Sequence, residues 1–66
     1  MMLQSTRRSE LNYQWADATH AWWPAGRDGI AVPVQVVVPQ GAVTYVRNFN
    51  GDVHDVPSEQ VSQLRG

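Results

Sequence analysis

The segment from Val43 to Leu64 constrains the fold of this chain more than any other part. It contains two β-rich runs, VTYVRNF and DVHDV, joined by Asn50-Gly51, a dipeptide that readily takes the positive φ angles of a tight hairpin. The second run ends at Pro57, and a polar turn of Pro57 to Gln60 precedes Val61 to Leu64. We therefore expect two strands, one helical turn and a final strand, which together make the closing half of a small, strongly bent β-barrel.

The upstream half supplies two more extended runs. The first strand is expected over Ala18 to Trp23, and a loop with two glycines, a proline and an Asp-Gly pair follows from Pro24 to Gly29. The next run reads IAVPVQVVV, and Pro33 within it indicates a strand edge or a bend. Alternation along this run predicts a core face made of Ile30, Val32, Val34, Val36 and Val38.

These runs make one all-β domain of five short strands in a chain of 66 residues. The strands are expected at residues 18–23, 30–38, 42–49, 52–56 and 61–64. Residues 1–14 follow neither the helix nor the strand period, so we expect a flexible N-terminal tail before a barrel domain at 15–66. A domain of this size buries only roughly 60% of its unfolded surface, and we expect self-association to supplement its small core.

Composition argues against several classes of partner. The formal net charge is -1, and the five basic residues are arginines that form no basic stripe, which disfavours tight nonspecific binding to nucleic acid. The chain has no cysteine and two histidines, so we expect neither a metal nor a cofactor. The longest apolar run is too short to span a bilayer and the polar start is unlike a signal peptide, so a cytoplasmic location is expected.

Several short motifs occur along the chain in a defined order. They are Ala21-Trp22, Asp28-Gly29, Val32-Pro33-Val34-Gln35-Val36, Tyr45-Val46-Arg47, Phe49, Asn50-Gly51-Asp52, Val56-Pro57 and Leu64-Arg65. This order resembles a Tudor domain, one of the Src-homology-3-like barrels, over about three quarters of the chain. The resemblance implies a bent five-stranded barrel that, in many Tudor domains, holds a methylated lysine or arginine in an aromatic cage through cation–π attraction.

The resemblance also implies which residues would form such a cage. Trp23 would be the wall on the first loop, Tyr45 or Phe49 the walls from the third strand, and Asn50 or Asp52 the polar partner. The aromatic residue that often precedes the proline of the second strand is missing, since Ala31 and Val32 stand there. The competing interpretation places Trp22, Tyr45 and Phe49 in the core with Trp23 half exposed, because so small a domain needs its aromatic residues for burial.

The adjacent tryptophans Trp22 and Trp23 are the strongest functional candidates. Alternation forbids both rings from pointing into one core, so one of them should face solvent, a partner or another copy of the chain. Arg27 and Asp28 on the adjoining loop would rim this aromatic surface with charge. We therefore predict a non-enzymatic protein- or peptide-interaction module, with a partner surface made of Trp22, Trp23, Arg27, Asp28, Tyr45, Phe49 and Asn50.

Two alternatives come from other functional classes. Nucleic acid would be contacted through Arg7, Arg8 and Arg47. The second alternative is an enzyme, implied by a resemblance to the type-B dihydrofolate reductases, which are also short barrels. Their Val-Gln-Ile-Tyr motif corresponds to the residues from Val53 to Val56 in this chain. The glutamine and the tyrosine of that motif are replaced here.

Other catalytic or metal-binding arrangements are sparse in this sequence. His54 and Asp52 share a strand face and would form a dyad, but an exposed polar face beside a hairpin explains them more simply. His20 and His54 could both bind a metal ion, but two ligands are too few to indicate a metal site.

Overall fold

The described residues, 6–7 and 11–65 of the computed structural model, form an all-β structure with almost no helix. One short 3-10 helix, η2, precedes the last strand at Ser58–Gln60, which confirms the predicted turn. The strands are β1 (Thr6–Arg7), β2 (His20–Trp22), β3 (Val32–Gln40), β4 (Val43–Arg47), β5 (Val53–Pro57) and β6 (Val61–Arg65).

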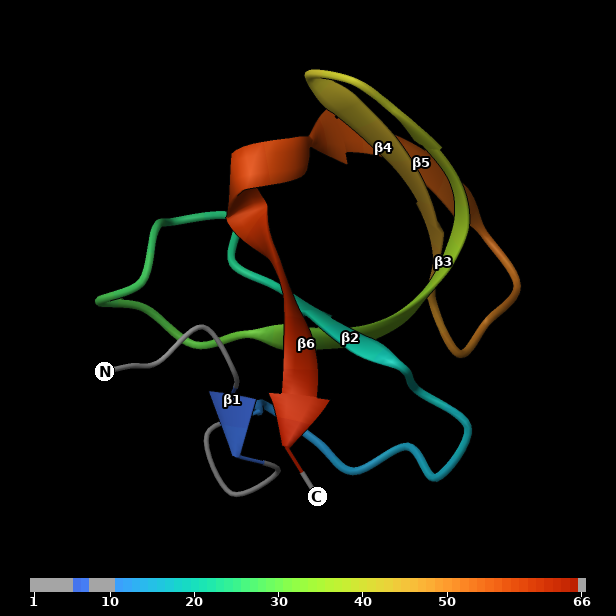
Figure 1. Ribbon diagram of the computed structural model, residues 1–66. Helices are drawn as coiled ribbons and strands as arrows, with labels where there is room; N and C mark the ends of the chain where they lie inside the picture. Colours follow the sequence, from blue (N-terminus) through green and yellow to red (C-terminus); the bar gives the residue numbers. More distant parts are fainter. Residues whose placement is uncertain (1–5, 8–10, 66) are drawn as a thin grey trace.

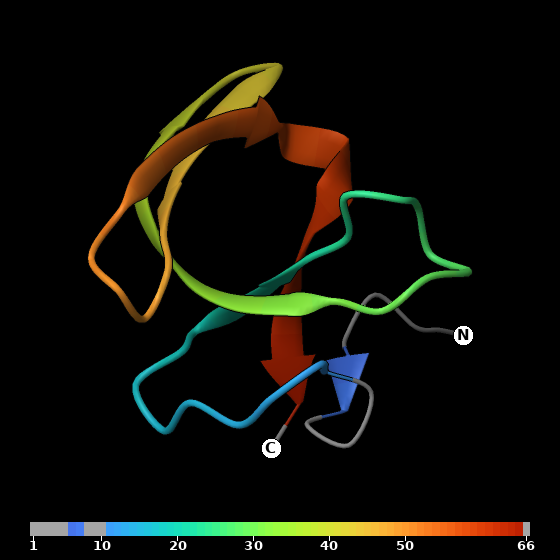
Figure 2. The same ribbon diagram turned by 180° about the vertical axis from the view of Figure 1, so that it is seen from behind.

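All six strands belong to one sheet in the order β1-β6-β2-β3-β4-β5. The five strands β2 to β6 pair antiparallel, whereas β1 runs parallel to β6. Figures 1 and 2 show the sheet curled into a ring, with η2 connecting β5 to β6. No ladder joins β5 to β6 within the described residues, so the sheet curls without closing.

The curl is concentrated in β3, which changes partner along its length. Its first residues, 32–34, pair with β2, and the residues from Gln35 onward pair with β4. Pro33 precedes Gln35, the first residue of β3 that pairs with β4. The missing N–H of Pro33 therefore removes no hydrogen bond between β3 and β4. A register shift between Val36 and Val38 marks a β-bulge, which bends the strand further.

The bulge corrects part of the predicted core face. Val34 is fully buried, and Val32 and Val36 pack against the same cluster, as predicted. Val38 is 40% exposed, because the extra residue in the bulge turns it to the opposite face of the sheet. Ile30 is 66% exposed because it precedes the strand.

Two glycine turns set the hairpins. Gly41 has a φ of 65° and opens the two-residue loop between β3 and β4, as in a type II′ turn. The predicted hairpin between β4 and β5 is present, but its loop runs over residues 48–52 and is longer than the predicted two-residue Asn50-Gly51 turn; in this loop only Gly51 has a positive φ, 89°. Asn48 organises this loop, since its Oδ1 accepts hydrogen bonds from the backbone N–H groups of Asn50 and Asp52, each at 3.0 Å. Phe49 therefore lies in the loop, outside the strand predicted to contain it.

Both faces of the sheet carry buried apolar residues. The inner cluster, inside the curl, contains Val34, Val46 and Val56, with Trp22, Val32, Val36 and Val61 packed against it. The outer cluster lies on the opposite face of β2 and contains Leu11, Ala21, Trp23 and Ala31, with Leu64 packed against it. The second cluster explains how a short chain buries residues on both faces of one strand.

The outer cluster depends on the segment upstream of the first predicted strand. Leu11 is 9% exposed, and the backbone N–H of Asn12 donates to the carbonyl oxygen of Ala31 at 2.9 Å. The mobile tail predicted for residues 1–14 falls largely outside the described residues. Within it, the contacts of Leu11 and Asn12 show that packing begins upstream of the predicted domain start at residue 15.

Removing the Leu11 side chain should destabilise the domain. Leu11→Ala is expected to lower the free energy of unfolding by about 2 kcal/mol, because it opens a cavity beside Trp23. Urea unfolding measures this loss, with Ile30→Ala, which removes an exposed aliphatic side chain, as the control expected to change stability by less than about 0.5 kcal/mol. Equal effects of the two substitutions would show that Leu11 does not pack as described.

Candidate functional site

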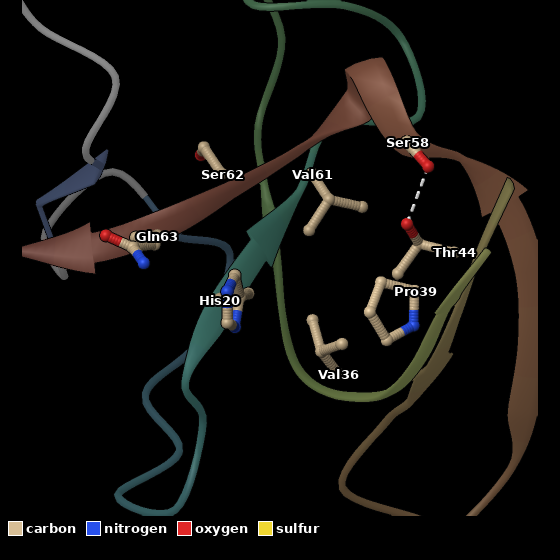
Figure 3. Close-up of a pocket in the computed structure, with 8 residues that line it drawn as sticks. All are labelled: His20, Val36, Pro39, Thr44, Ser58, Val61, Ser62 and Gln63. Carbon is tan, nitrogen blue, oxygen red and sulfur yellow. Dashed lines mark hydrogen bonds between the residues drawn. The ribbon is translucent and has the colours of Figure 1, made fainter. Parts of the chain in front are cut away.

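A pocket of about 410 Å³ lies on the inner face of the curled sheet. Figure 3 shows that Val36, Pro39 and Val61 point toward one another across it, from β3 and β6. Polar side chains without formal charge surround this apolar floor: His20 on β2, Gln63 on β6, Thr44 on β4 and Ser58 on η2. Ser62 also borders the pocket, but its hydroxyl lies on the opposite face of β6, where it is bonded to Trp23. The pocket therefore combines an apolar floor with hydrogen-bonding groups and has no charged side chain in its lining.

His20 is the titratable side chain of the pocket. Its Nδ1 is hydrogen-bonded to Thr19 Oγ1 at 2.8 Å. Partial burial lowers the pKa of His20 below its ordinary value of 6.5, because the charged imidazolium is less well solvated there. The imidazole is therefore neutral near pH 7 and offers one donor and one acceptor nitrogen.

The far wall of the pocket is held by η2. Ser58 Oγ donates to the carbonyl oxygen of Gly41 at 2.6 Å and is hydrogen-bonded to Thr44 Oγ1 at 2.7 Å. The backbone N–H of Ser58 donates to the carbonyl oxygen of Ala42 at 2.9 Å. These bonds fix η2 to the β3–β4 hairpin, so the hydroxyl groups on this wall keep a defined position.

The two tryptophans lie on opposite faces of the sheet, as alternation predicts, and Trp22 packs against the inner cluster as the competing interpretation has it, but Trp23 is not half exposed. Trp23, predicted to be a half-exposed wall, is 6% exposed, and its Nε1 donates to Ser62 Oγ at 3.0 Å. It is buried because the outer cluster covers the face of β2 that alternation assigns to it. Trp22 is half buried on the inner face, donates from Nε1 to Gln60 Oε1 at 3.0 Å and stacks on His54 with ring centroids 6.0 Å apart.

The remaining predicted residues are spread over the surface. The Arg27 guanidinium carbon lies 5.7 Å from the centroid of the Trp23 ring, a cation–π geometry, and Asp28 is exposed on the same loop. Tyr45 is 37% and Phe49 56% exposed, contrary to the interpretation that places them in the core. Asn50 is exposed and held by Asn48.

The rings carried over from the Tudor resemblance do not meet. Phe49 contacts Tyr13 edge-on, with centroids 4.9 Å apart, and desolvation raises the pKa of that tyrosine. No ring contact joins Trp23, Tyr45 or Phe49 to one another in the described part of the chain. The structure therefore brings Trp23 and Arg27 together but does not assemble the aromatic walls.

Sequence reasoning missed the pocket residues. The sequence predicts Val36 as a core position and Val61 only as the start of the final strand, and no local pattern marks Thr44, Ser58 or Ser62 as their neighbours. Their approach depends on the bend of β3 and the return of β6 to β2, which are long-range features. His20 had been considered only as a metal ligand.

The structure does not link His54 and Asp52, which the sequence places on one strand face as a candidate dyad. His54 stacks on Trp22, and no hydrogen bond or ion pair links it to Asp52. Among residues 6–7 and 11–65, no three histidine, cysteine or carboxylate side chains gather closely enough to hold a metal ion. No helix within these ranges has the length and apolarity needed to cross a bilayer.

Comparison with protein-family models, with curated proteins and with solved structures finds no match to this chain. A functional assignment therefore rests on the geometry of the chain itself.

Loss of the Ser62 hydroxyl should be costly. Ser62→Ala leaves the buried Trp23 Nε1–H without its acceptor, and we expect the free energy of unfolding to fall by about 1–2 kcal/mol. Gln63→Ala, an exposed change one residue along β6, is the control and should have little effect. Denaturant unfolding of both variants measures the difference, and a loss no larger in Ser62→Ala than in the control would contradict the bond.

Stability should depend on pH through His20. Because the pKa of His20 is lower in the folded state than in the unfolded chain, the unfolded chain takes up the proton first as pH falls. The free energy of unfolding should therefore be highest above pH 6.5 and fall as pH is lowered through that value. His20→Gln should reduce this fall, as measured by urea unfolding between about pH 7.5 and 5. An unchanged pH profile in the variant would rule out this role.

Proposed function

We propose that this chain is a non-enzymatic peptide-interaction module that receives an uncharged aliphatic side chain in the pocket. The observation that carries the proposal is the lining itself, an apolar floor of Val36, Pro39 and Val61 within a rim of neutral polar groups. Ligand pockets typically measure roughly 300 to 1,000 Å³ and combine apolar walls with a few polar groups that orient the ligand. The volume of about 410 Å³ lies within that range.

The absence of charged side chains from the lining favours an uncharged, aliphatic side chain as the group that binds there. A charged side chain entering this pocket would lose solvation without gaining a counter-charge, whereas an aliphatic side chain would replace water against the apolar floor. The amide of Gln63 and the imidazole of His20 lie side by side on neighbouring strands, since these residues are cross-strand partners. They are suited to hydrogen-bond the peptide groups that flank such a side chain.

Two features support binding in preference to catalysis. His20 is hydrogen-bonded to the hydroxyl of Thr19, and no carboxylate lines the pocket to orient or activate the imidazole. The Ser58 hydroxyl donates to a backbone carbonyl, so its proton is already engaged.

We further propose that the fold is a Tudor-like barrel. The antiparallel run from β2 to β5, the short helix before β6 and the return of β6 to β2 support this proposal.

A titration with capped amino-acid amides tests the proposed site. N-acetyl-leucine amide should shift the backbone amide resonances of His20, Val61 and Gln63, whereas N-acetyl-lysine amide and N-acetyl-aspartate amide should not. Val36→Phe, which fills the pocket, should abolish the shifts, and Val53→Phe, the same change at an exposed valine, should preserve them. The proposal fails if leucine amide leaves these resonances unmoved, if the charged amides act equally, or if Val36→Phe has no effect.

A further inference from the structure

The convex side of the β3–β4–β5 sheet carries a second surface, which the pocket does not use. Residues on β4 alternate, with Thr44 and Val46 buried and Val43, Tyr45 and Arg47 exposed. Cross-strand partners share a face, so the register extends this row to both neighbouring strands. Its members there are exposed, except that Gln35 is half buried and donates from Nε2 to the carbonyl oxygen of Asp17 at 3.0 Å. We call the resulting set of nine residues the Tyr45 face: Gln35, Val38, Gln40, Val43, Tyr45, Arg47, Val53, Asp55 and Pro57.

Five of the nine residues of the Tyr45 face are apolar or aromatic, and four of these are well exposed. Val38, Val43, Tyr45 and Val53 are between 37% and 50% exposed. Val38 pairs with Tyr45, Val43 lies two residues from Tyr45 on the same face of β4, and Val53 is diagonal to Tyr45 on β5. Contiguous exposed apolar residues of this kind mark interaction surfaces, whereas single ones do not. The outer cluster formed with Leu11 covers the same side of the sheet over β2 but does not include these residues.

The face has two charged residues, placed at right angles around Tyr45. Arg47 lies two residues along β4 from Tyr45, and Asp55 lies directly across from Tyr45 on β5. No ion pair joins Arg47 or Asp55 to another described residue. One step along a strand face spans about 6.7 Å and one step across strands about 4.8 Å. The two charges therefore lie at similar distances from Tyr45 in perpendicular directions.

This placement makes the face complementary to itself in one orientation. A two-fold axis through Tyr45, lying in the face and inclined about 45° to the strands, exchanges the along-strand and across-strand directions. Rotation about this axis sets Arg47 of one copy over Asp55 of the other, and Asp55 of the first over Arg47 of the second. In each pair the two positions are offset by about 2 Å, the difference between the along-strand and across-strand steps, which a long arginine side chain can span. The same rotation sets Val38 of one copy over Val43 of the other, and the two copies of Val53 over each other.

We propose that a second copy of this chain docks on the Tyr45 face in this orientation, with the strands of the two sheets crossing near 90°. Orthogonal packing is one of the two ordinary ways in which sheets meet face to face. An axis parallel to the strands would place Arg47 over Arg47, and an axis perpendicular to them within the face would place Asp55 over Asp55. Like-charge repulsion disfavours both of these aligned arrangements.

The size of the face sets the strength of the dimer. Nine residues on each side are fewer than the roughly 20 to 30 of a standard interface, so the dimer should dissociate on dilution. The pocket stays accessible, because its lining residues Pro39 and Thr44 are cross-strand partners outside the nine and Thr44 is buried on the inner side of β4. Dimerisation therefore goes beyond the proposed peptide binding and does not depend on it.

Charge reversal tests the orientation. In sedimentation equilibrium over a series of concentrations, the unmodified chain should reach a monomer–dimer equilibrium. Arg47→Asp and Asp55→Arg should each weaken the dimer about tenfold, because each replaces two attractive contacts by two repulsive ones. The double variant should restore association to within about threefold of the unmodified chain. Asp28→Arg, the same charge change at an exposed loop residue, is the control and should leave association unchanged.

Each outcome of this experiment decides the proposal. It fails if the unmodified chain is monomeric at its highest attainable concentration, which would leave the face to a different protein. It also fails if the double variant associates no better than the single ones, or if Asp28→Arg weakens association as much as Asp55→Arg. The fold of each variant is checked by its amide spectrum. Retained leucine amide binding in a monomeric variant would separate failure of the dimer from failure of the pocket.

Discussion

Two adjacent indoles, those of Trp22 at the end of β2 and of Trp23 directly after it, hold the final strand in place, and the remaining architecture depends on them. Trp22 donates its indole N–H to Gln60 in η2, while Trp23 donates to Ser62 in β6 from the opposite face. The backbone N–H of Trp23 also donates to the carbonyl oxygen of Gln60 at 2.7 Å. Three hydrogen bonds from two consecutive residues thus secure the segment that leads the chain back across the curled sheet.

This attachment also creates the pocket. Ser58, at the start of η2, is bonded to the β3–β4 hairpin through Gly41, Ala42 and Thr44. β6, at the end of η2, is bonded to β2. The pocket lies between these two attachments and takes its lining from both, so its shape follows from the same bonds that complete the fold. A binding site built on strands and a fixed helical turn needs little reorganisation to accept a ligand.

Sequence reasoning reached the local features and missed those that depend on distant contacts. The hairpin at Gly51 and the helical turn after Pro57 are encoded by adjacent residues, and both were predicted. The exposure of Trp23 was predicted wrongly, because alternation shows that Trp22 and Trp23 face opposite sides but does not show that Leu11 helps to bury the second side. Val38 was misplaced because a bulge leaves no clear mark in a run of valines. The pocket could not be predicted from the sequence, because it forms only where β6 returns to β2.

The aromatic residues of the sheet divide into two that hold the fold together and one that is exposed. Trp22 and Trp23 stabilise the fold, whereas Tyr45, a core candidate in the sequence, is exposed on the face that we propose for a second copy of the chain. The most direct test of this division is the hydrogen-exchange rate of the Trp23 indole N–H. Exchange of this N–H should be slowed by a free energy close to that of global unfolding, because the group is buried and bonded to Ser62. Exchange at the rate of an exposed indole would contradict it.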